Sequence, residues 1–213
     1  MRLMMAAAMA ALLAGCATGM SEDECAGADW ADIGQRDGLY GEGPDKFSER
    51  AERCAGFGLE ADYEAYQAGR SKGLRTYCTP EAGYDAGRNG RPYRGVCPAD
   101  LEGEFLSEYN IGRRLFDLSA ALDEARSDYD DAVNDLERSR YEFRKARERF
   151  NDPNLSEAER KDAGKDMDRY RRKIEDLEDA LPRMSDAIHR AEGELEDYRA
   201  FVARRDRRAT KAR

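Results

Sequence analysis

Histidine is nearly absent from this chain: its 213 residues contain one, His189. Catalytic triads and most zinc sites rely on histidine. The sequence also lacks a nucleophile elbow, a phosphate-binding loop and a group of potential metal ligands at the usual spacing. Its acidic residues are too numerous for one pair to stand out as general acid and base. We expect His189 at the surface, no catalytic residue, no metal and no cofactor. An unrecognised hydrolase is the remaining enzymatic alternative.

A membrane-spanning apolar run is missing from the start of the chain. The uncharged stretch 3–13 is too short to cross a bilayer. Arg2 precedes it, and Ala14-Gly15 lead directly into Cys16. This arrangement matches the lipobox of bacterial lipoproteins, so we expect a signal peptide at 1–15, acylation of Cys16 and a short tether at 16–24. The alternative is an ordinary secretory signal with a chance cysteine.

Position 17 and the net charge narrow the expected location and partners. Residue 17 is Ala, whereas an Asp there favours retention of a lipoprotein in the inner membrane. We therefore expect an outer-membrane lipoprotein that faces the periplasm. The formal net charge of −9 argues against nucleic acid as a partner.

Four cysteines besides Cys16 lie in the first half of the mature chain: Cys25, Cys54, Cys78 and Cys97. An even number in an oxidising compartment predicts two disulfides. No pair has the two-to-four-residue spacing of structural zinc sites, although free or metal-binding thiols remain the alternative. Of the three possible connectivities we favour Cys25–Cys54 with Cys78–Cys97, because each bridge would close a local helix–loop–helix unit.

Three segments repeat a Tyr-x-x-Gly-Arg pattern, and their arginines are Arg70, Arg88 and Arg113. Glycines also recur at a spacing of four, which places each pair on one helical face. The first interpretation is close packing of short helices, because paired glycines let another backbone approach. The second is a groove in which the three arginines bind an anionic group.

The order of cysteines, glycines and aromatic residues over about 13–113 is distinctive. It includes Cys25-x3-Asp29-Trp30-x2-Ile33-Gly34-x2-Asp37-Gly38, Tyr66-x2-Gly69-Arg70-x2-Gly73-Leu74-x2-Tyr77-Cys78 and Gly95-Val96-Cys97-Pro98. This pattern resembles the bacterial envelope lipoprotein family known as domain of unknown function 2799. The resemblance implies a secreted or lipid-anchored, cysteine-bearing module, and it implies no activity.

The second half of the chain predicts a long antiparallel coiled-coil hairpin at 114–203, with a loop near 151–156. Apolar and small residues alternate in spacings of three and four before and after Pro153, which is the heptad pattern. Two registers are open, in which facing residue numbers add to 313 or to 306, and we prefer the first. Pro182 should bend the second helix without ending it.

The charged residues outside the seam predict a solvated surface, and the tail at 204–213 is strongly basic. This tail could contact anionic cell-wall or headgroup surfaces by charge. The expected fold class is all-α: a disulfide-stapled helical module at 25–113, the hairpin and the tail. We expect a non-enzymatic, lipid-anchored scaffold or adaptor whose hairpin binds an envelope protein. The alternative is a module for a small anion or cell-wall fragment at the Tyr-x-x-Gly-Arg segments.

Overall fold

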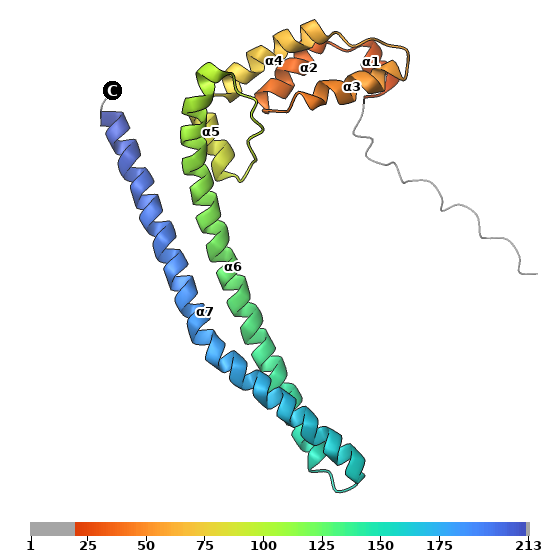
Figure 1. The fold of residues 1–213 in the computed structure, drawn as a ribbon, viewed down its shortest axis with the longest axis vertical. Helices are drawn as coiled ribbons and strands as arrows, with labels where there is room; N and C mark the ends of the chain where they lie inside the picture. The colour runs from red at the N-terminus through yellow and green to blue at the C-terminus, as the bar shows by residue number, and fades with distance from the viewer. Residues whose placement is uncertain (1–19, 212–213) are drawn as a thin grey trace, which may run out of the picture. The chain divides into compact units, whose positions relative to one another are not determined.

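The computed structural model describes residues 20–211, and every regular element in that range is an α-helix (Figure 1). The all-α prediction is therefore confirmed. The helices are α1 (Glu22–Ala26), α2 (Trp30–Leu39), α3 (Asp45–Ala55), α4 (Tyr63–Tyr77), α5 (Pro80–Arg88), α6 (Ala99–Phe150) and α7 (Glu157–Lys211). Cys16 and the predicted signal peptide lie outside the described residues.

The chain divides into two compact units. The first comprises Met1–Ala86 and Arg91–Tyr109, and the second comprises Gly87–Gly90 and Asn110–Arg213. The second unit thus takes in Gly87–Gly90, at the end of α5 and just beyond it, and continues from Asn110, close to residue 114 where the sequence predicts that the hairpin begins. We call the first unit the module and the two long helices of the second unit the hairpin.

Side-chain caps start the helices where the sequence offers them. Asp29 accepts a hydrogen bond from the Asp32 amide at the start of α2, and Asp62 accepts one from the Ala65 amide at the start of α4. Each bond satisfies an amide that the helix itself leaves unpaired. At the start of α7, Ser156 and Glu159 form the capping box that their spacing predicts.

The module has two hydrophobic clusters, and a disulfide lies in each. Cys25–Cys54 belongs to a cluster that includes Trp30, Ile33 and Tyr66. Cys78–Cys97 belongs to a second cluster with Leu74, Tyr77, Ala86 and Phe105. The favoured connectivity is therefore confirmed. Because α4 supplies Tyr66 to one cluster and Leu74 to the other, this helix joins them.

Four glycines bring α2 and α4 into backbone contact, and Figure 1 shows these helices side by side. A Cβ atom at Gly34 would lie 2.8 Å from the carbonyl carbon of Tyr66, and one at Gly73 would lie 2.7 Å from the amide nitrogen of Leu39. Gly38 and Gly69 are equally close to the opposite helix. The close-packing interpretation of these two glycine pairs is confirmed.

The hairpin consists of α7 and the part of α6 after Asn110, and the turn covers 151–156 as predicted. Leu118, Leu122 and Leu195 form its buried cluster, and Leu115, Ile188, Ala191 and Tyr198 pack against it. The ion pairs across the seam fix the register: the residue numbers of Arg126 and Glu192 add to 318 and those of Asp135 and Lys173 add to 308, values that are symmetric about 313. The structure therefore has the preferred register.

Ion pairs cross both flanks of the hairpin seam. Arg126 pairs with Glu192 at 2.7 Å on one flank, and Lys173 pairs with Asp135 at 2.9 Å on the other. Exposed pairs of this kind contribute little stability but discriminate between registers. Pro182 lies inside α7, which continues on both sides of it, and Figure 1 shows this helix bent in the middle of its length. The helix also extends past 203 into the basic tail.

We expect Gly69→Ala to destabilise the module. Its Cβ would lie 2.7 Å from the carbonyl carbon of Ala31, so α2 and α4 would have to separate, at a cost of about 1–3 kcal/mol or more. Urea denaturation followed by circular dichroism measures the change. Gly103→Ala in α6 is the control, because no atom lies within 4 Å of its new Cβ; it should raise stability by up to about 1 kcal/mol. Equal stability of the Gly69 variant and the native protein would contradict the contact.

Candidate functional site

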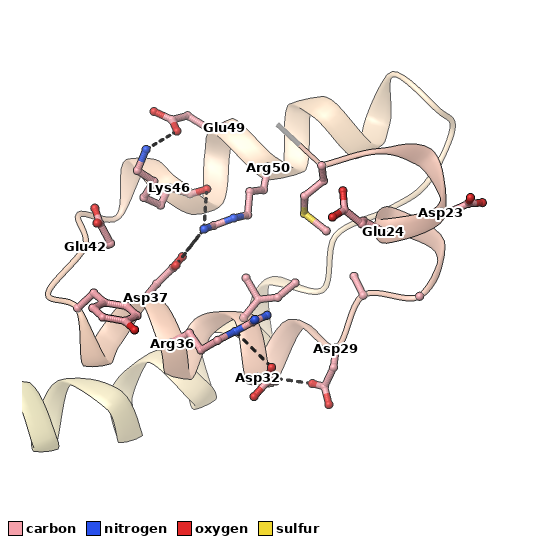
Figure 2. Close-up of a pocket in the computed structure, with 15 residues that line it drawn as sticks. Asp23, Glu24, Asp29, Asp32, Arg36, Asp37, Glu42, Lys46, Glu49 and Arg50 are labelled. Atoms are coloured by element: carbon pink, nitrogen blue, oxygen red, sulfur yellow. Dashed lines mark hydrogen bonds and ion pairs between the residues drawn. The ribbon is translucent and has the colours of Figure 1, made fainter. Parts of the chain in front are cut away.

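A cleft of about 700 Å³ lies between α1, α2 and α3 of the module, and Figure 2 shows its lining side chains. Its apolar surface comes from Met20, Ala28, Ile33 and Tyr40. Tyr40 is largely exposed, at 71% of its residue surface. The charged lining residues are Asp23, Glu24, Asp29, Asp32, Arg36, Asp37, Glu42, Lys46, Glu49 and Arg50.

Asp37 is a buried acid at the base of this cleft. Its carboxylate, 5% exposed as a residue, accepts hydrogen bonds from both terminal nitrogens of Arg50, one of them at 3.0 Å. It also accepts a hydrogen bond of 2.8 Å from the hydroxyl of Tyr66, which comes from α4. A buried carboxylate requires such partners because desolvation of an unpaired charge is costly. The triad therefore ties three helices together beneath the cleft.

The environment of Tyr66 fixes the direction of its hydrogen bond with Asp37. Burial, together with the adjacent Asp37 carboxylate, raises the pKa of Tyr66 well above the usual range of a phenol. The hydroxyl therefore keeps its proton at physiological pH and acts as a donor to Asp37. Its side chain also packs against the ring of Phe47 from α3.

The three cations of the cleft are all paired with carboxylates inside it. Arg50 pairs with Asp37, Lys46 with Glu49 at 2.8 Å, and Arg36 with Asp32 at 3.3 Å. Figure 2 shows the Arg36 guanidinium beside Asp32, along α2. Its Nε atom makes the contact with Asp32, so its terminal nitrogens keep donors for a ligand.

Two further carboxylates of the cleft serve as helix caps. Glu24 accepts hydrogen bonds from the backbone and side chain of Ser21, and these bonds lower the pKa of the Glu24 carboxyl. Asp29 caps α2 through one carboxylate oxygen. Among residues 20–208, whose side chains the structure describes, neither carboxylate forms an ion pair.

The loop between α2 and α3 borders the cleft and is held from several sides. The carbonyl oxygen of Glu42 accepts a hydrogen bond of 2.8 Å from Arg70, and its carboxylate pairs with Arg94 at 2.8 Å. Gly41 has a φ of +65°, and a Cβ there would collide with the ring of Tyr77. Arg70 therefore positions one edge of the cleft.

Arg70 belongs to the module, whereas Arg88 and Arg113 belong to the second unit. Arg113 pairs with Asp117 at 2.9 Å, donates to the carbonyl oxygen of Gly90 and lies over the ring of Phe116. The structure thus gives Arg70 and Arg113 partners within their own units. A shared anion site of the three arginines stays a prediction.

The hairpin carries a separate shallow hollow on the outer surface of α6, which we call the Tyr141 face. Its residues are Asp131, Asn134, Asp135, Glu137, Arg138 and Tyr141. The side chain of Tyr141 is 51% exposed, with Lys145 and Arg144 at 5.3 and 5.9 Å from its ring centre. His189, by contrast, is exposed on α7 as expected and lies 3.4 Å from Glu192.

Asp37 and Arg50 were not predicted as site residues from the sequence. In the sequence, Asp37 was part of the family motif next to Gly38 but had no role assigned to it. Arg50 is one of many arginines in a highly charged chain. Buried carboxylates in helices are uncommon. The available signal was the position of Asp37 on the same helical face as Ile33, which predicts that its side chain points inward.

We expect Asp37→Asn to lower the free energy of unfolding by about 2–4 kcal/mol, because Arg50 would lose its countercharge in a partly buried position. Urea denaturation of the purified protein measures this loss. Asp32→Asn is the matched control: both members of the Asp32–Arg36 pair are 61% exposed, and the expected cost is about 0.5 kcal/mol or less. Equal effects of the two substitutions would contradict a structural role for the buried triad.

None of the described helices has an apolar stretch long enough to cross a bilayer. No curated protein and no solved structure matches the chain. One family model does match, over residues 29–114, and its description is "Protein of unknown function (DUF2799)". The matched segment contains α2 to α5, three of the four disulfide cysteines and both α2/α4 glycine pairs. Residues 29–114 therefore match this family of unknown function, and the match ends before most of the hairpin.

Proposed function

We propose that the protein is a non-enzymatic adaptor of the bacterial cell envelope. A lipid on Cys16 would anchor it to the outer membrane, facing the periplasm, and the hairpin would bind an envelope protein. The arrangement of lipobox residues at 13–16 supports the anchor. The Tyr141 face is the observation that supports a protein partner.

The composition of the Tyr141 face suits protein recognition. Tyrosine and arginine are enriched where protein interfaces contribute most binding energy, because they offer large contact area together with hydrogen bonds. Here an exposed tyrosine stands among acidic, basic and amide side chains on a helix whose opposite face is held in the seam by Leu136 and Ser139. A partner could therefore bind without opening the hairpin.

The alternative function is the binding of a small anion or cell-wall fragment at the Tyr-x-x-Gly-Arg segments. Among the described side chains, the Nε atom of Arg70 is buried without a hydrogen-bond partner, which favours a further acceptor beside it. The basic residues of the tail, such as Arg207 and Arg208, could add contacts with an anionic surface. Loss of function in Arg70→Ala with an intact hairpin would favour this alternative.

Photocrosslinking in cells tests the partner. A photoreactive amino acid at Arg138 should capture one defined envelope protein, and Tyr141→Ala should weaken that capture several-fold because the central contact is lost. Asp179, exposed on α7, is the control position and should capture nothing defined. Equal capture from positions 138 and 179, or capture unaffected by Tyr141→Ala, would contradict the proposal.

Acylation is a separate prediction. The mature protein should carry the added mass of its acyl chains and partition with membranes, and Cys16→Ser should remove both properties because only that thiol is acylated. Thr18→Ser is the control and should retain them. Intact-protein mass spectrometry after membrane extraction measures the result. A native protein whose first residue is an unmodified Cys16 would contradict the anchor.

A further inference from the structure

The seam of the hairpin retains apolar surface along its middle. The hairpin is a single layer of two helices (Figure 1). Its buried residues in this part come from α6 and are mostly small: Ala132, Leu136, Ser139 and Ala146. The large apolar side chains that α7 places opposite them are only half-buried: Tyr170, Ile174, Leu177, Leu181 and Met184. A second layer of helices could bury what the first leaves exposed.

The charges of the hairpin are separated along its length. Residues 138–173, which we call the tip half, contain 13 Lys and Arg against 8 Asp and Glu. Residues 117–137 and 174–197, which we call the base half, contain 3 Lys and Arg against 17 Asp and Glu. The two halves therefore have opposite net charges, although the chain as a whole is acidic.

This separation makes the hairpin complementary to a second copy of itself in one orientation. Each half is about 30 Å long, so antiparallel copies place each tip half on the partner's base half over the full length. Parallel copies place base on base, where like charges repel. The antiparallel overlap is about 60 Å long and two helices wide. It covers about 1,000 Å² on each partner, which is within the range of stable interfaces.

One flank of the seam shows the same separation in individual side chains. The ion pairs Arg126–Glu192 and Arg140–Glu178 cross this flank at 2.7 and 2.5 Å. Residues four or seven positions from these lie on the same helical faces. Four exposed residues meet that condition, two from the tip half and two from the base half: Arg144, Arg147, Asp130 and Glu196.

These four charges have no opposite charge within the described part of the chain. Arg144 lies over the ring of Tyr141, and none of the four forms an ion pair there. Val133 lies on the same flank, seven residues from both Arg126 and Arg140, and it is half-buried. The flank thus combines apolar surface with cations toward the tip and acids toward the base.

We propose that two copies of this chain associate in antiparallel orientation through this flank, with the tip half of each on the base half of the other. Val133 and the half-buried seam residues supply the apolar contact. The charges select the orientation, because exposed ion pairs add little affinity whereas like-charged contacts are disfavoured. The association goes beyond the proposed function and depends neither on the lipid anchor nor on an envelope partner.

Sedimentation equilibrium tests the association, with the mature, disulfide-bonded chain carrying Cys16→Ser so that no acyl chain aggregates it. At low ionic strength the protein should reach twice its monomer mass and should dissociate on dilution. Added salt should raise the dissociation constant, because it screens the charges. A monomer at every concentration, or an association that salt strengthens, would overturn the proposal.

Two charge reversals test the orientation. Asp130→Lys with Glu196→Lys makes the chain less acidic, and Arg144→Glu with Arg147→Glu makes it more acidic. Both variants should raise the dissociation constant about tenfold, because each removes opposite-charge contacts that occur twice in the dimer. If like-charged halves faced each other, both variants would lower it. Opposite effects of the two variants would show that only net charge matters. Either result contradicts the antiparallel contact.

Glu52→Lys with Glu60→Lys is the matched control. Both residues are exposed in the module, and the pair changes the net charge as much as the base-half variant does. The dissociation constant should stay within about twofold of the native value; an effect as large as that of Asp130→Lys with Glu196→Lys would overturn the assigned flank. Circular dichroism verifies that each variant keeps its helices.

Photocrosslinking locates the contact directly. Isotopically light and heavy chains with a photoreactive amino acid at position 147 are mixed, so that adducts between two copies contain both isotopes. These adducts should join position 147 to peptides of the base half. Mixed adducts within the tip half would overturn the orientation.

Discussion

The module depends on the contact between α2 and α4, where the helices meet backbone to backbone. Gly34 and Gly38 from one helix face Gly69 and Gly73 from the other, and a methyl group at any of them would overlap main-chain atoms. Each glycine weakens its own helix. The contact offsets that loss by holding Asp37 of α2 within reach of Tyr66 of α4, and the loop after α2 within reach of Arg70.

The position of the cleft follows from this contact. With α2 fixed on α4, the disulfide Cys25–Cys54 links the end of α1 to the end of α3. The ion pair of Arg50 with Asp37 then fixes α3 at its middle. The space left between these attachments is lined by charged groups whose hydrogen bonds hold the helices in place. The cleft is therefore framed by residues that also hold the helices in place, among them the helix caps Glu24 and Asp29 and the Asp37–Arg50 pair.

The sequence predicted local features well and long-range polar contacts poorly. Heptad spacing located the hairpin and its register, and the number and spacing of the cysteines predicted both disulfides. These predictions depend on periodicity and short-range geometry. The Asp37–Arg50–Tyr66 triad joins residues up to 29 positions apart, and nothing in a chain with 36 basic and 45 acidic residues indicates which charges are buried. The cleft could not be predicted for the same reason.

The two disulfides join cysteines that are consecutive along the chain: the first with the second, and the third with the fourth. The loops that the bridges close have sequence separations of 29 and 19, and they neither overlap nor enclose one another. Each bridge can therefore form independently of the other, and the hairpin contributes no cysteine that could compete for either one.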